Sequence, residues 1–233
     1  MPTNITTVPG WVTPQSVVTG DAISSTLWNN LADDVAMLYG KPWIYAYQLT
    51  NTTTTPFAAS STAGNGVGNP IFKTSTVGGS YNVLTNSPAS GLGSFSITGS
   101  TGVINFPTNS GSVVPGLYRV TVQLMVGQNS TNFYRPIIVT QGGGTQQSYH
   151  PGSWFQSTSS AGVYPPMTMS LILPIGSGTW AATTNFYVTG QDSGSAPGNL
   201  LATDSGSLGP SSTPPVYNSW VFAEYLGTST GTF

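Results

Sequence analysis

The feature that most constrains the fold is a period of two residues in the side-chain pattern. It begins at residue 43 and recurs in several segments up to residue 226. In WIYAYQL (43–49), Trp43, Tyr45, Tyr47 and Leu49 alternate with Ile44, Ala46 and Gln48. The same period is present in LYRVTVQLMV (117–126), MTMSLILPI (167–175) and SWVFAEYL (219–226). A period of two is typical of half-buried antiparallel strands.

Further strands are predicted in short apolar runs between Gly-, Ser-, Thr- and Pro-rich segments. We expect them at 70–74, 81–85, 102–106, 133–140 and 184–190. The chain lacks the alternating strand and helix segments that a parallel sheet needs. The sequence therefore predicts an all-β domain over 42–233, folded as a sandwich or jelly roll.

The stretch GDAISSTLWNNLADDVAMLYGKP (20–42) has a different period. Ser24 or Ser25 can cap the start of a helix, and Gly40 followed by Pro42 ends it. One apolar stripe would then lie along the predicted helix 25–39, formed by Leu27, Trp28, Leu31, Val35 and Leu38. An isolated helix of this length is marginal in water, so the stripe needs a partner to pack against.

Residues 1–19 precede this helix and carry Pro2, Pro9 and Pro14. Proline disfavours helix and makes the preceding residue extended, so we expect an extended arm. The arm has apolar side chains, Trp11 among them, that an extended segment cannot bury by itself. We therefore predict that residues 1–41 form an arm and an anchor helix, and that both contact another surface.

Charge limits the classes of partner. Charged residues make up 4% of the chain, against a typical value of about 25%. Its four lysines and arginines are too few for the phosphate contacts of nucleic-acid binding. The longest apolar runs, such as MSLILPIG, are far shorter than the roughly 20 residues of a membrane-spanning helix. Interfaces are depleted in charge and enriched in aromatic residues, so this composition favours assembly into an oligomer.

Two parts of the sequence resemble known families. The segments VINFPTNSGSVVPGLYRVTVQLMV (103–126), FYRPIIV (133–139), MSLILPIGSGTWAATTNFYVTG (169–190) and SWVFAEYLG (219–227) resemble the C1q/TNF-like jelly-roll module. The segment WVTPQSVVTGDAISSTLWNNLADDVAMLYGKP (11–42) resembles the front of bacteriophage virion proteins. Residues 50–100 carry no such resemblance.

These resemblances imply a phage structural protein: a homotrimeric jelly roll on the particle surface, held by its N-terminal arm and helix. We expect a capsid decoration protein or short head fibre that contacts the major capsid or other virion proteins. The alternative is a tail-associated receptor-binding or glycan-binding protein of the same architecture. The helix stripe has two possible partners, the virion surface or the other two copies of the chain in the trimer.

The residues that catalysis would need are scarce and scattered. His150 is the sole histidine and cysteine is absent, so a triad would need a carboxylate from elsewhere in the sequence. Asp192 and Asp204 lie in segments typical of turn aspartates, and Glu224 is the remaining acid after residue 41. We expect His150 in a surface loop, no enzymatic activity and no cofactor. Calcium is disfavoured because its usual Asp-x-Asp spacing is missing.

The segment GTQQSYHPGSWF (144–155) offers aromatic side chains that can stack on sugar rings. The other interpretation is that these aromatics pack on a neighbouring subunit. A host surface glycan is therefore kept as a possible partner.

Overall fold

The computed structural model describes residues 40–49, 57–59, 70–73, 81–86, 88, 92–127, 133–142, 147–156, 166–176, 180–193, 199–200 and 219–227. The secondary-structure elements in these ranges are β-strands. The predicted arm and the predicted helix 25–39 lie outside the described residues. The division of the chain at residues 41 and 42 stays a prediction.

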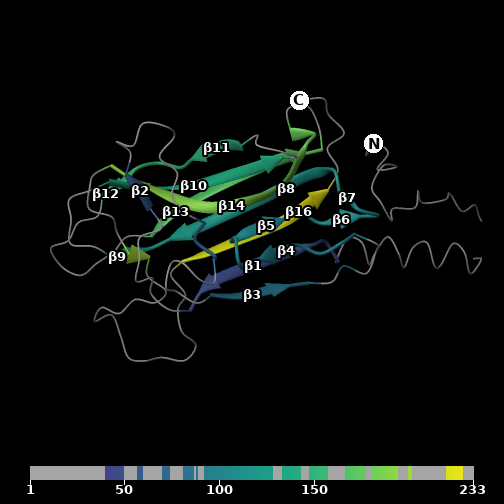
Figure 1. Cartoon of the computed structure of the whole chain (residues 1–233), viewed down its shortest axis with the longest axis horizontal. Helices are drawn as coiled ribbons and strands as arrows, with labels where there is room; N and C mark the ends of the chain where they lie inside the picture. The colour runs from purple at the N-terminus through teal and green to yellow at the C-terminus, as the bar shows by residue number, and fades with distance from the viewer. Residues whose placement is uncertain are drawn as a thin grey trace, which may run out of the picture.

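The described strands form two main sheets. Sheet A has five strands in the spatial order β13 (Met167–Ile175), β8 (Gly116–Leu124), β16 (Trp220–Gly227), β1 (Trp43–Gln48) and β3 (Tyr81–Thr85). Sheet B has the order β11 (Gln147–Pro151), β10 (Phe133–Gly142), β14 (Thr183–Asp192), β5 (Val103–Asn105) and β4 (Ser96–Thr98). The long strands of both sheets run along the longest axis of the molecule (Figure 1).

Short strands complete this arrangement. β12 (Phe155–Gln156) pairs antiparallel with the first two residues of β10, and β2 (Phe57–Ala59) pairs in parallel with the end of β14. Two small ribbons pair β6 (Thr108–Asn109) with β7 (Ser112–Val113), and β9 (Val126–Gly127) with β15 (Asn199–Leu200).

The pairing of the eight principal strands is nested. In chain order they are β1, β5, β8, β10, β11, β13, β14 and β16. The first pairs with the last, the second with the seventh, the third with the sixth and the fourth with the fifth, all antiparallel. This nesting across two sheets is the topology of a jelly roll. The all-β jelly-roll sandwich expected from the sequence is thereby confirmed.

Aromatic side chains fill the core between the two sheets. Tyr118 of β8 packs on Tyr225 of β16 with ring centroids 5.1 Å apart, and on Phe106 at 4.8 Å. Phe106 in turn contacts Phe186 of β14 at 5.2 Å, which joins the two sheets. The Tyr118 hydroxyl donates to the Val114 carbonyl oxygen at 2.6 Å, so the polar end of this buried ring has a partner.

One glycine is required by the packing of this core. Gly116 begins β8 with a φ of +151°, which residues with a side chain rarely adopt. A Cβ atom at this position would lie 2.5 Å from both the Gly227 carbonyl oxygen and Tyr225 Cε2. The Pro-Gly step that precedes Leu117 and Tyr118 therefore allows β8 to pass close to β16.

Most of the predicted strands are present in the structure, and one predicted strand is not. Of the segment predicted as a strand at 70–74, the structure describes 70–73, and these residues form no strand because Ile71 and Phe72 lie in a bend. Ile71 still donates its N–H to the Val188 carbonyl oxygen at 2.9 Å, and Ile71 and Phe72 are buried in the core. The apolar pattern correctly marked core residues, but an irregular segment carries them.

Candidate functional site

The outer face of sheet A carries an unusual concentration of aromatic rings. They come from the two central strands: Trp43, Tyr45 and Tyr47 of β1, and Trp220 and Phe222 of β16. We call these five residues the aromatic face. The register places Tyr45 opposite Phe222 and Tyr47 opposite Trp220. Ring centroids lie 5.9 Å apart for Tyr45 and Trp220, and 6.4 Å apart for Trp43 and Phe222.

Successive side chains of a strand point to opposite faces, so these rings lie on the face opposite to the residues that alternate with them. Ile44, Ala46, Val221 and Ala223 are completely buried between the sheets. The register pairs Ile44 with Ala223 and Ala46 with Val221, so these four side chains form the inward side of the β1–β16 pair. The larger apolar side chains of β1 and β16 therefore lie on the outer side of sheet A, where Trp43, Tyr45, Trp220 and Phe222 are partly exposed and Tyr47 is 8% exposed.

The flanks of the aromatic face are also apolar or uncharged. Leu84 of β3 pairs with Tyr45 and is 49% exposed, and Ile172 of β13 is 56% exposed. Thr121 and Ser170 lie beyond Phe222 in the same cross-strand row, with their hydroxyl oxygens 3.0 Å apart. Large apolar side chains gathered on one surface mark an interaction site more often than apolar side chains scattered singly.

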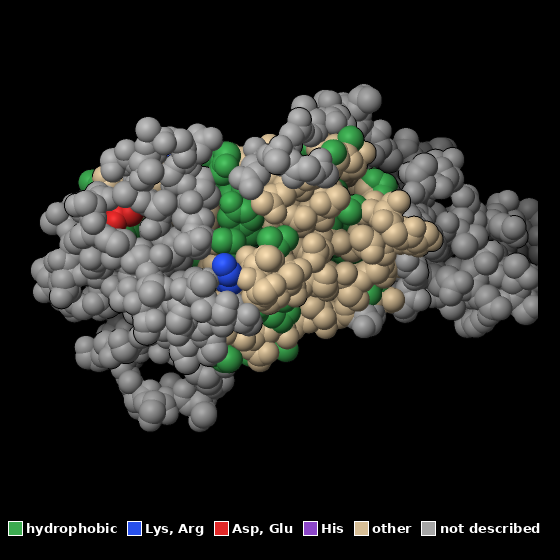
Figure 2. All heavy atoms as spheres, in the orientation of Figure 1, with side chains coloured by type: hydrophobic (Ala, Val, Ile, Leu, Met, Phe, Trp, Pro, Cys, Tyr) green, Lys and Arg blue, Asp and Glu red, His purple; other side chains and the backbone are tan. Residues whose placement is uncertain are grey.

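An ion pair lies beside the aromatic face, on the same side of sheet A. Arg119 of β8 donates from Nε to Glu224 Oε1 of β16 at 2.7 Å, and its Nη2 donates to the same oxygen. The register places this pair in one row with Trp43 on one side and Ile172 on the other. On the side of the molecule drawn in Figure 2, where this ion pair is not seen, uncharged groups predominate among the described residues.

The aromatic face was not among the sites predicted from the sequence. The predicted interface residues lie outside the described residues: Trp11, Leu27, Trp28, Leu31, Val35 and Leu38. A signal was nevertheless present, because WIYAYQL places all three of its rings on one side of the strand and SWVFAEYL places Trp220 and Phe222 on one side. Alternation alone could not say which side is the core.

His150 is not in a surface loop, which corrects the sequence-based expectation. It lies in β11, half-buried and on the core side of sheet B, with its ring centroid 5.1 Å from that of Trp180. Its Nε2 is 3.3 Å from Thr140 Oγ1. Burial lowers the pKa of His150 below its ordinary value of 6.5, so the neutral imidazole is favoured.

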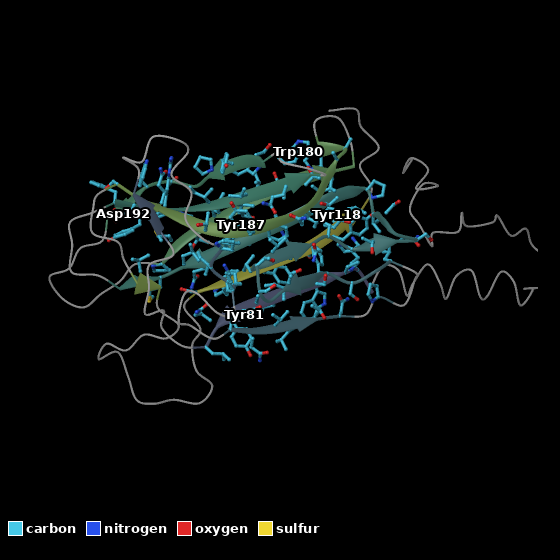
Figure 3. All side chains as sticks on the ribbon, in the orientation of Figure 1. Tyr81, Tyr118, Trp180, Tyr187 and Asp192 are labelled. Carbon is cyan, nitrogen blue, oxygen red and sulfur yellow. The ribbon has the colours of Figure 1, made fainter. Side chains whose placement is uncertain are left out.

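Asp192 is not a turn aspartate either. It ends β14 and is 1% exposed, with its Cα paired with that of Tyr134. Figure 3 shows Asp192 at the opposite end of the sandwich from Trp180, which precedes the same strand. Asp204 lies outside the described residues, and Glu224 is engaged by Arg119.

The described residues bring together no group of three or more His, Cys, Asp or Glu side chains that would suit a metal ion. In the same ranges, no helix is long and apolar enough to cross a membrane. The expectations that the chain binds no metal or cofactor and is not an enzyme stay predictions.

Comparison with known proteins gives similarity to solved structures but not to known sequences. No family model and no curated protein matches the sequence. Among solved structures, the chain is similar to the structure of Eiger TNF from S. frugiperda, with 10% sequence identity and a TM-score of 0.46. The similarity covers 83% of this chain and 98% of that chain. The jelly-roll assignment itself follows from the strand order of the two sheets.

Proposed function

We propose that the chain is a non-enzymatic structural protein of a bacteriophage virion, displayed on the particle as a homotrimer. The jelly roll is the displayed part, and the arm and helix of residues 1–41 attach it. Within this proposal the chain is a capsid decoration protein or short head fibre. The resemblance of residues 11–42 to the front of phage virion proteins supports the attachment.

The observation that carries the proposal is the aromatic face. Trp, Tyr and Phe are enriched at subunit interfaces and charged residues are depleted in interface cores. An interface of standard size buries about 800 Å² on each partner, and such interfaces are centred on a few large side chains. Three copies related by a closed rotation would cover this face without leaving apolar surface for further association.

The sheet edges favour contact through a face. β13 is an edge strand of sheet A and contains Pro174, while β11 is an edge strand of sheet B and ends at Pro151. Proline has no N–H to donate and weakens pairing with a strand of another molecule. Association through the outer surface of sheet A is therefore favoured over addition of a strand at these edges.

A tail-associated receptor-binding protein is the second candidate. The exposure of Trp154 and Phe133, 41% and 43%, favours it, since exposed aromatic rings often contact ligands. An image of the particle at subunit resolution separates the two positions. We expect trimeric density on the head, with residues 1–41 against capsid subunits. Density confined to the tail would favour the second candidate, and a particle without the protein would contradict both.

A further inference from the structure

Arg135 is held in place by two neighbours on the outer face of sheet B. Its Nε donates to Gln191 Oε1 at 2.8 Å, and its Nη2 donates to the same oxygen. Its Cζ lies 4.4 Å from the centroid of the Trp154 ring, in cation–π contact. Gln191 is only 8% exposed, so this anchor of the guanidinium is itself fixed by burial. Among the described residues, Nη1 of Arg135 has no acceptor.

The charge of Arg135 is not neutralised by any described carboxylate. Glu224 pairs with Arg119 on the other sheet, and Asp192 follows Gln191 in β14, so it points to the opposite side of the strand. Both groups that hold Arg135 are neutral. A half-buried cation without a counter-ion loses hydration without full compensation. An anionic ligand would supply the missing charge.

Exposed aromatic side chains lie beside this cation. Phe133 is two residues before Arg135 in β10 and therefore on the same face, and it is 43% exposed. Trp154 is 41% exposed, while its neighbour Phe155 packs on the main core. Ser193 lies at the rim, where its hydroxyl accepts the Phe133 N–H at 2.9 Å. We call Phe133, Arg135, Trp154, Gln191 and Ser193 the Arg135 patch.

We propose that the Arg135 patch binds a sugar that carries a carboxylate group. The planar guanidinium is suited to a carboxylate, and its Nη1, which has no acceptor among the described residues, provides the donors. The apolar C–H side of a pyranose ring can pack on the exposed rings of Trp154 and Phe133. A single fixed cation in a nearly uncharged surface suits a monoanion, whereas a polyanion such as nucleic acid needs several cations. This proposal requires no trimer and no particular place on a virion, so it stands or falls separately from the proposed function.

The test measures binding of sialyllactose and of lactose to the full-length chain by titration calorimetry and ligand-observed NMR. The two sugars share a neutral disaccharide and differ in the acidic residue. We expect sialyllactose to bind at least about tenfold more tightly than lactose. Arg135→Gln and Trp154→Ala should each weaken sialyllactose binding by about tenfold or more. Lys73→Gln removes the same charge elsewhere and should leave binding unchanged.

Arg135→Lys keeps the charge but loses the planar donor pair, so it should also weaken binding. With Trp154→Ala it provides the test if circular dichroism shows that Arg135→Gln disturbs the fold. Equal binding of sialyllactose and lactose, or no binding of either, would overturn the proposal. Sialyllactose binding that survives Arg135→Gln in a folded protein would do so too. If acetate competes as well as sialyllactose, a carboxylate site exists but the sugar assignment is wrong.

Discussion

Arg119 and Glu224 form an ion pair across the β8–β16 ladder, in the same row of side chains as Trp43 and Ile172. The side chains are 49% and 22% exposed, so solvent screens the pair in the isolated subunit. In the proposed trimer this face is covered, and the two charges then compensate each other within one subunit. Because the two charges compensate each other, they can lie beside the aromatic face at a small cost in the free energy of association.

Glu224→Gln is therefore predicted to weaken association more than folding. It leaves the Arg119 guanidinium unpaired where the partner covers it, which should raise the dissociation constant of the oligomer by about tenfold or more. The matched control, Arg119→Gln with Glu224→Gln, removes both charges and should recover most of the loss. Sedimentation equilibrium measures both variants. Wild-type association of the single variant would mean that the ion pair lies outside any interface.

The Tyr118 hydroxyl is predicted to stabilise the fold by its hydrogen bond to Val114. Tyr118→Phe leaves the buried Val114 carbonyl without this donor, so the free energy of unfolding should fall by about 1–3 kcal/mol. Tyr225→Phe is the matched control, because its hydroxyl lies 3.3 Å from the Pro115 carbonyl oxygen and should contribute less. Burial raises the pKa of Tyr225 to about 12, so its hydroxyl stays protonated at neutral pH. Urea denaturation measures both variants, and an equal fall in the free energy of unfolding for Tyr118→Phe and Tyr225→Phe would contradict this prediction.

The half-buried His150 should lower the free energy of unfolding when the solution is made mildly acidic. Burial lowers its pKa in the folded state below 6.5, so the unfolded chain takes up the proton first as the pH falls. The stabilisation is complete above 6.5 and is lost as the pH falls toward the lowered folded value. Between about pH 7.5 and about pH 5.5, the unfolding temperature should fall more for the wild type than for His150→Gln. Equal falls in calorimetry would show that His150 does not contribute.

The predicted anchor is tested by particle binding. Deletion of residues 1–41 should leave a folded trimer that no longer binds virions lacking the protein. Leu31→Asp with Leu38→Asp in the full-length chain should have the same effect, because charges in the stripe prevent its burial. If the stripe instead packs within the trimer, these variants should dissociate the oligomer. Normal occupancy of particles by the truncated protein would place the anchor in the jelly roll.

The fold was largely predictable because strands such as β8 and β16 alternate between buried and more exposed side chains. In β8, the predicted face of Tyr118, Val120, Val122 and Leu124 is completely buried. The short strands β4 and β11 were missed, since Ser, Thr, Gln and Gly around SIT and QSYHP hide the alternation. Pairing partners far apart in sequence, such as β1 and β16, depend on the whole topology and cannot be read from either strand alone.

The candidate site was harder to predict than the fold. In β1 and β16 both faces are apolar, so the alternation alone does not decide that Ala46 and Ala223 point inward. That orientation depends on the packing of the two sheets, which the local sequence does not contain. The contact of Arg135 with Trp154 similarly joins β10 to the segment between β11 and β12, and no spacing in the sequence indicates it.

The central claim is that the aromatic face joins three copies of the chain, and light scattering on the purified full-length chain tests it most directly. At micromolar concentration the mass should be near three times the chain mass of 24.1 kDa. Phe222→Glu should reduce it to that of one chain while the fold is kept, because a carboxylate cannot be buried unpaired. Phe133→Glu, on the outer face of the other sheet, should stay trimeric. A wild-type mass of one chain, or a trimer unaffected by Phe222→Glu, would contradict the account.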